Sequence, residues 1–205
     1  MTQAIPTVHL IDDDIAFLTA TARLFRAAGL TVAQFGSAQE FLASLTLETR
    51  GCVIADLKMP GLNGLDMQTA LVRTKNPLPV IFLTGYGDIP ASVRAMRNGA
   101  EDFLEKHAPK EHLLEAVNRA LSRDAEAQER RDRVNEFRSR FASLSEREHE
   151  VLHHVLQGKL NKQIAFDLGI HERTVKAHRT AITTKLRVHS VAILTRLAQE
   201  IGLFG

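Results

Sequence analysis

The chain has 205 residues, of which 44% are hydrophobic and 24% charged, a composition typical of soluble globular proteins. Its first residues, MTQAIPTVHL, lack the basic stretch and the apolar core of a signal peptide, and no apolar run approaches the roughly 18 residues that span a bilayer. The single cysteine, Cys52, excludes an internal disulfide and fits a reducing compartment. We therefore expect a cytoplasmic protein without a membrane partner.

The charge is unevenly distributed along the chain. Residues 1–124 contain 12 Lys/Arg against 14 Asp/Glu, whereas residues 125–205 contain 14 against 10. Within residues 159–187 alone, basic residues outnumber acidic ones by 7 to 2. This asymmetry predicts two domains, the second of which faces a polyanion.

Five short apolar runs alternate with helical patterns in the first part of the chain. They are TVHLID (7–12), LTVAQF (30–35), CVIAD (52–56), PVIFLT (79–84) and DFLEK (102–106). Three of them are apolar almost throughout, as expected of strands that are buried on both faces. The alternation predicts a parallel, doubly wound α/β sheet with helices on both faces.

Polar side chains end four of these strands. Asp12 and Asp13 close the first, Asp56 the third, Thr84 the fourth and Lys106 the fifth. Because a doubly wound sheet binds ligands at the carboxyl ends of its strands, we expect these groups to form one polar site. Carboxylates with one lysine suit Mg²⁺ together with a phosphoryl group. An ionised Asp56 needs no general base to act as a nucleophile, while Lys106 and the Thr84 hydroxyl offset charge on the transferring phosphoryl group.

Asp14 comes one residue later, at the start of the first helical pattern. A carboxylate there favours unpaired backbone amides and the positive end of the helix dipole. The run of three aspartates is therefore interpreted as a metal pair, Asp12 and Asp13, followed by a residue that caps the helix or joins the acidic pocket through water.

Residues 124–143 are polar, charge-mixed and free of Pro and Gly, which predicts a helical linker. Four apolar residues recur in and just after it at spacings of 3, 4 and 3, namely Val134, Phe137, Phe141 and Leu144. This stripe is expected to pack either on the second domain or on a second copy of the chain.

A small all-α domain is predicted for residues 144–205. Ser145 opens an S-x-x-E capping box. Helical patterns without any strand pattern follow, at residues 146–156, 161–168, 172–186 and 190–201.

The first part of the chain resembles the receiver domain of bacterial two-component response regulators. The matching residues are Asp12, Asp13, Asp56, Met59, Pro60, Gly64, Thr84, Gly85 and Lys106. The resemblance implies a flavodoxin-like (βα)5 receiver domain over residues 1–123, phosphorylated on Asp56 by a sensor histidine kinase. It also implies Mg²⁺ held by Asp12, Asp13, Asp56 and the backbone carbonyl of Lys58. Thr84 and Phe103 match the family's switch pair, in which the aromatic ring turns inward when the hydroxyl moves toward the phosphate.

One departure from that family concerns the residue after the lysine of the fifth strand. The family usually has proline there, in a cis peptide that aims the lysine, whereas this chain reads Lys106-His107-Ala108-Pro109. A cis bond before His107 would cost about 3 kcal/mol. Either that strain is tolerated or the loop is rearranged.

The second part of the chain resembles the LuxR/NarL/FixJ-type DNA-binding domain. Ala165, Gly169 and Val175 in IAFDLGIHERTV have the spacing of a helix-turn-helix. The segments LSEREHEVL (144–152) and RTVKAHRTAITTKL (173–186) extend the match.

The second helix of this motif, which would lie in the major groove of double-stranded promoter DNA, carries the predicted base-reading residues. An inward stripe of Val175, His178, Ile182 and Leu186 leaves an outward face that consists of Arg173, Lys176, Ala177 and Thr180. The candidates for phosphate contacts are Lys159, Lys162, Arg179 and Lys185.

Two helix caps and one possible interface complete this domain. His171 stands where the family often has serine, which predicts a weaker cap, and Ser190 is expected to cap the last helix. The apolar stripe of that last helix resembles the family's dimerisation face and consists of Val191, Leu194, Ala198 and Ile201.

The leading hypothesis is a phosphorylation-controlled transcription factor rather than an enzyme. Phosphorylation of Asp56 would promote homodimerisation through the face between Ile89 and Arg123 and place two DNA-binding domains on paired half-sites, with RNA polymerase as a further partner. A phosphatase with an aspartyl-phosphate intermediate is disfavoured, because Lys58 occupies the place of its acid-base aspartate. A sigma-factor-like promoter reader is disfavoured by the phosphoacceptor domain, and a phosphate-independent regulator stays an alternative because of His107.

Overall fold

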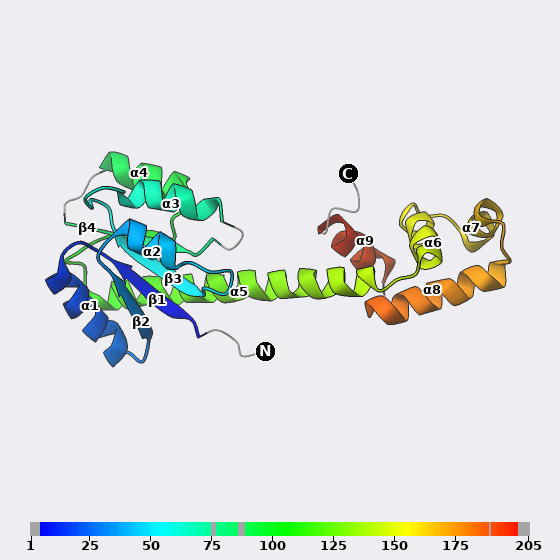
Figure 1. Ribbon diagram of the computed structural model, residues 1–205, viewed down its shortest axis with the longest axis horizontal. Coiled ribbons are helices and arrows are strands. Elements are labelled where there is room, and N and C mark those ends of the chain that lie inside the picture. Colours follow the sequence, from blue (N-terminus) through cyan, green and yellow to red (C-terminus); the bar gives the residue numbers. More distant parts are fainter. Residues whose placement is uncertain (1–4, 75–76, 86–88, 189, 201–205) are drawn as a thin grey trace. The chain divides into compact units, whose positions relative to one another are not determined.

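The computed structural model describes residues 5–74, 77–85, 89–188 and 190–200. The chain divides into two compact units, Met1–Ala127 and Gln128–Gly205 (Figure 1). Within the described residues, no helix combines the length and the apolar character needed to cross a membrane.

The first unit is built on a five-stranded parallel sheet (Figure 1). Its strands are β1 (Thr7–Ile11), β2 (Thr31–Phe35), β3 (Gly51–Asp56), β4 (Val80–Thr84) and β5 (Asp102–Glu105). They lie in the order β2-β1-β3-β4-β5. This is the flavodoxin-like order, whose direction of winding reverses between β1 and β3. The predicted α/β fold is confirmed.

Helices cover both faces of this sheet. One face is packed by α1 (Ile15–Ala27) and the first part of α5 (Lys110–Ala142). The other is packed by α2 (Ala38–Ser44), α3 (Gly64–Val72) and α4 (Ile89–Arg97). Successive residues of the central strands β3 and β4 enter the two cores alternately, so both faces of these strands are apolar. In these two strands the polar side chains, Asp56 and Thr84, are thereby confined to the carboxyl ends.

Asp14 is the N-cap of α1. Its side chain accepts hydrogen bonds from the backbone N–H groups of Ala16 and Phe17, at 2.9 and 3.1 Å. The capping role that the sequence predicted for Asp14 is confirmed, and its carboxylate is engaged away from the other two aspartates.

The helix α5 continues without a break from Lys110 to Ala142, so the predicted linker is the second half of a single helix. Asp124, placed by the sequence at the start of that linker, is buried in the first unit. Its Oδ2 accepts hydrogen bonds from the backbone N–H of Gly51 at 2.9 Å and from Nε of Arg50 at 3.1 Å. This buried carboxylate fastens α5 to the start of β3.

In the part of the second unit that the structure describes, the end of α5 is followed by α6 (Glu146–Leu156), α7 (Asn161–Leu168), α8 (Glu172–Leu186) and α9 (Val191–Glu200). Its core includes Phe137 and Leu144, with Phe141 packed against it. Of the two alternatives for the apolar stripe at the end of the linker, packing on its own domain is confirmed for these three residues.

Candidate metal centre and nucleic-acid interface

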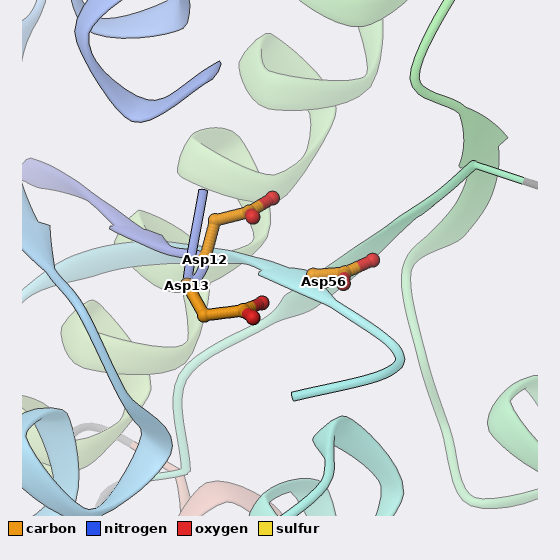
Figure 2. A group of neighbouring side chains, drawn as sticks. All are labelled: Asp12, Asp13 and Asp56. Carbon is orange, nitrogen blue, oxygen red and sulfur yellow. The ribbon is translucent and has the colours of Figure 1, made fainter. Parts of the chain in front are cut away.

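Three carboxylates meet at the carboxyl ends of β1 and β3, which are neighbours in the sheet (Figure 2). Asp12 follows β1 directly, Asp56 ends β3, and one oxygen from each of Asp12, Asp13 and Asp56 lies within 4.8 Å of the others. Asp12 and Asp56 are only 2% and 8% exposed, whereas Asp13 is exposed. Such a cluster of oxygen donors with one open side fits Mg²⁺, which takes carboxylates and retains several waters.

Lys106 supplies the positive charge at this site. Its Nζ lies 2.6 Å from Oδ2 of Asp12, 3.6 Å from Oδ1 of Asp56 and 4.6 Å from the centroid of the Phe17 ring. The backbone N–H of Lys106 donates to the Thr84 carbonyl at 2.8 Å. The described residues contain no cis peptide bond, so Lys106 reaches the carboxylates with a trans bond before His107.

The charges of this cluster shift the pKa values of its members. Burial raises the pKa of Asp56, the charges of Asp12 and Asp13 raise it further, and Lys106 opposes them only in part. Burial alone would lower the pKa of Lys106, but its hydrogen bonds and charge interactions with Asp12 and Asp56 raise it overall. The ammonium is therefore firmly charged, whereas the surroundings of Asp56 disfavour the ionised form of its carboxyl group.

The two predicted switch residues lie on neighbouring strands. Thr84 is buried at the end of β4 and is paired in register with Glu105 of β5. Phe103, on β5, is partly buried, and its ring centroid lies 6.3 Å from that of Phe82. The loop after β3 brings Lys58, which is exposed, two residues beyond Asp56.

A hollow of about 590 Å³ adjoins the acidic cluster. Its lining includes Asp13, Lys58, Met59 and Pro60 from the two loops and Arg94 from α4. The acidic cluster is therefore open to solvent on the side where Asp13 is exposed. Arg94 was not identified from the sequence, because nothing along the chain indicates that α4 borders this loop.

Gly64 explains how the loop after β3 folds back beside the acidic cluster. Its backbone N–H donates to the Leu57 carbonyl at 3.1 Å, and a Cβ on it would lie 2.6 Å from the Asp56 carbonyl oxygen and 2.8 Å from the Phe82 ring. Only glycine allows this approach, because the Asp56 contact is with backbone that cannot move aside.

In the second unit, α7 and α8 form the predicted helix-turn-helix. The turn contains Gly169, whose φ of 62° is the left-handed conformation that glycine adopts without strain. Along α8 the inward side chains are Val175, Ile182 and Leu186, all buried, with His178 partly buried. All four predicted base-reading residues are exposed, namely Arg173, Lys176, Ala177 and Thr180.

The four candidates for phosphate contacts differ in their surroundings. Lys162 is exposed. Arg179 donates to Oδ1 of Asn161 at 2.9 Å, and Lys159 pairs with Asp167 at 2.7 Å. Lys185 donates to Oε2 of the buried Glu148 at 2.7 Å, so the structure gives this lysine a role in holding α6 to α8.

Glu148 links the α6 cap to α8. Its Oε2 also accepts from the backbone N–H of Ser145, whose hydroxyl caps Glu148 in return, which confirms the predicted capping box. The hydrogen bond from Lys185, followed by that from Ser145, lowers the pKa of Glu148 below its ordinary value of 4.5.

Replacing Glu148 with glutamine is expected to lower the free energy of unfolding at pH 7 by about 1 kcal/mol, since the charge-assisted bond from Lys185 becomes one to a neutral amide, whereas the capping box with Ser145 can still form. Because the folded-state pKa is depressed, the carboxylate stabilises the fold above pH 4.5 and loses this effect as the pH falls below it. Denaturant unfolding followed by circular dichroism should therefore show the difference in stability between the two proteins shrinking as the pH falls below 4.5. The matched control is Glu146→Gln, an exposed first-turn residue, and an equal loss there would contradict the assignment.

The caps of the last two helices are as the sequence predicted. His171 makes no side-chain cap bond to α8, and the Ser190 hydroxyl accepts from the Ala192 N–H at 3.2 Å. Leu194 and Ala198, two residues of the stripe that resembles the family's dimerisation face, are buried within the unit, so they pack on the chain's own core. The side chain of Val191, and Ile201 as a whole, lie outside the described residues.

Comparisons with known proteins match both units. Residues 8–118 match the family described as "Response regulator receiver domain", and residues 142–198 match "Bacterial regulatory proteins, luxR family". Nodulation protein W of Bradyrhizobium diazoefficiens is 43% identical over 96% of this chain and 86% of its own length. Transcriptional regulatory protein FixJ of Azorhizobium caulinodans is 40% identical over 99% of this chain and 96% of its own.

Solved structures give the same result. The response regulator StyR superposes with a TM-score of 0.83 at 40% identity, covering 96% of this chain and all of StyR. Full-length FixJ from B. japonicum superposes with a TM-score of 0.58 at 34% identity and 98% coverage of both chains. With an acidic cluster at the switch point of one unit and a helix-turn-helix in the other, the chain belongs to the response regulators, as a receiver domain followed by a LuxR-type DNA-binding domain.

Proposed function

We propose that Asp56 accepts a phosphoryl group from a sensor histidine kinase and that this controls binding of promoter DNA through α8. The observation that carries the proposal is the convergence of three carboxylates and the Lys106 ammonium where β1 and β3 end. Nucleophile, metal ligands and countercharge are then within reach of one phosphoryl group.

The proposed transfer uses the chain's own residues as follows. A carboxylate oxygen of Asp56 attacks the phosphorus of the kinase phosphohistidine, the P–N bond breaks, and its electron pair returns to the imidazole. Lys106 offsets the charge of the phosphoryl oxygens, and the Thr84 hydroxyl donates to one of them. Asp12, Asp13, Asp56 and the carbonyl of Lys58 would hold Mg²⁺, which supplies further positive charge there. The only group that the protein converts is its own side chain, so it does not act as a conventional enzyme.

Phosphorylation is proposed to act through the α4 side of the receiver domain. As Thr84 engages the phosphate, the Phe103 ring would turn inward and change the surface between Ile89 and Arg123. That surface exposes Ile89, Val93 and Met96 by 76%, 44% and 48%, which suits contact with a second copy of the chain. Dimerisation would raise the effective concentration of the second DNA-binding domain on paired half-sites in the cytoplasm, where RNA polymerase is the further partner.

The test is the affinity of the full chain for its preferred DNA, selected from a random library, with and without Mg²⁺ and a small-molecule phosphodonor. We expect tighter binding and a dimer with the donor. Equal affinity and a monomer in both conditions would overturn phosphorylation control and favour the phosphate-independent alternative.

Substitutions of two lysines are expected to distinguish a side chain that contacts bases from one that contacts phosphates. Lys176→Ala is expected to cost about 1–3 kcal/mol of binding and to relax preference at one base pair, since it removes a side chain from the groove-facing surface. Lys162→Ala should weaken all sequences alike and reduce the salt dependence by about one charge. Anisotropy titrations on the selected and singly substituted sites would distinguish the two, and identical behaviour of both variants would contradict the assignment.

A further inference from the structure

A second hollow, of about 530 Å³, lies in the DNA-binding unit and is lined by residues of the end of α5, the end of α8 and α9. Its apolar lining comes from Phe137, Leu186, Val188, Ile193 and Leu197. Its charged lining comes from Arg130, Arg133, Glu136, Arg140, Arg187 and Arg196. Among the described residues that line it, five arginines thus face one acidic residue.

That acidic residue is already engaged. Glu136 pairs with Arg140 one helical turn away, and Arg140 also reaches the Leu186 carbonyl at 3.4 Å. Arg133, Arg187 and Arg196 are exposed at the same hollow. The lining is therefore electropositive and suited to an anion, and guanidinium groups bind phosphate through paired N–H donors.

Arg187 provides an independent observation. It follows α8 with φ 52° and ψ 43°, and among the described residues it is the one non-glycine with positive φ. A helix end of this kind favours glycine, because a Cβ strains the left-handed conformation. Strained residues cluster at functional sites. Here the residue with the strained backbone is Arg187, whose side chain lines the hollow.

We propose that this arginine-lined hollow binds backbone phosphates of DNA beside the base pairs that α8 reads, which rests on the DNA-binding function proposed above. Arg187 ends the same helix, seven residues after the groove-facing Thr180, or about 10 Å along the axis. The major groove is about 12 Å wide and edged by phosphates, so a helix that reads bases near its start brings its end to that edge. The end of α5 thereby becomes part of the DNA interface.

The test compares full-length variants, with Mg²⁺ and phosphodonor, on the selected DNA at several salt concentrations. Arg187→Gly is the sharpest variant, because glycine fits the backbone conformation and should leave the thermal midpoint unchanged or higher. We expect its affinity for DNA to fall about 3- to 10-fold, with sequence preference retained. The slope of log affinity against log salt concentration should correspond to about one fewer phosphate contact. Arg133→Gln and Arg196→Gln should behave alike. Arg138→Gln, exposed on the same helix but outside the hollow, is the matched control.

Three results would overturn the proposal. Arg138→Gln could weaken binding as much as Arg133→Gln, or the hollow variants could leave the salt dependence unchanged. Alternatively, the variants could abolish a thermal stabilisation by ATP or GTP without any change in DNA affinity, which would assign the hollow to a free nucleotide. If the unsubstituted chain prefers no DNA sequence, it is the DNA-binding function itself that fails.

Discussion

Asp56→Asn is expected to reduce phosphorylation by a labelled phosphodonor or kinase to background. The asparagine amide keeps the size of the side chain but offers no carboxylate to attack phosphorus, and it removes the negative charge of one of the three carboxylates that cluster within 4.8 Å. The fold should be retained, because burial raises the pKa of this carboxylate and so opposes its charge. The variant should bind DNA equally with and without the donor.

Intact-protein mass spectrometry after incubation with donor and Mg²⁺ checks this result, since one phosphoryl group adds about 80 Da to the unsubstituted chain. Asp132→Asn, an exposed aspartate on α5 in the other unit, is the matched control and should be labelled like the unsubstituted protein. Undiminished labelling of Asp56→Asn would mean that a different residue is the acceptor.

Gly51→Ala is expected to destabilise the receiver unit by about 3 kcal/mol or more. Gly51 begins β3 with φ 116°, and an added Cβ would lie 1.9 Å from the Thr7 carbonyl oxygen of the adjacent strand. The backbone N–H of Gly51 also donates to the buried Asp124, so a shift that relieves the clash would break the bond that fastens α5 to the sheet.

The control for this prediction is Gly29→Ala, at the end of α1. Gly29 has φ 81°, but a Cβ there meets no atom within 4 Å, so only the backbone strain of about 1 kcal/mol is expected. Urea unfolding followed by circular dichroism should therefore rank the two variants clearly. Equal losses would show that the close approach to Thr7 is relieved without cost.

The strands and the acidic site of this protein follow from local sequence. Both faces of β3 and β4 are buried, so the sequences of these strands are continuous apolar runs. The polar residues of the two strands are those at their ends, Asp56 and Thr84. In a parallel sheet the carboxyl ends of the strands lie at one edge, so the sequence alone predicted that Asp12, Asp56 and Lys106 lie together, as the structure shows. The cap at Asp14 was equally local.

The helix-turn-helix could also be predicted from local sequence. The stripe of Val175, Ile182 and Leu186 has the period of a helix, and it is buried as its spacing indicates. The opposite, exposed face then follows by geometry alone.

What the sequence could not settle are pairings between residues far apart in the chain. The sequence predicted a phosphate contact for Lys185, but it gave no sign that this lysine donates a hydrogen bond to the buried Glu148, 37 residues earlier. Likewise, the periodicity of α9 predicts that Leu194 and Ala198 face an apolar surface. It does not indicate whether that surface belongs to the same chain, as the structure shows, or to a second copy.

Sequence by itself therefore determined the order of the helices and strands, the acidic residues at the strand ends and the helix-turn-helix. Each of these depends on residues that are neighbours in the chain, and the acidic site depends also on the rule that parallel strands end at one edge of the sheet. Tertiary structure alone decided that Asp124 anchors α5 to β3 and that Gly64 lets the loop after β3 fold back beside the acidic cluster. It also decided that arginines of α5, of α9 and of the end of α8 line one hollow. Each of these depends on which surfaces pack together, and that is a property of the whole fold rather than of any segment.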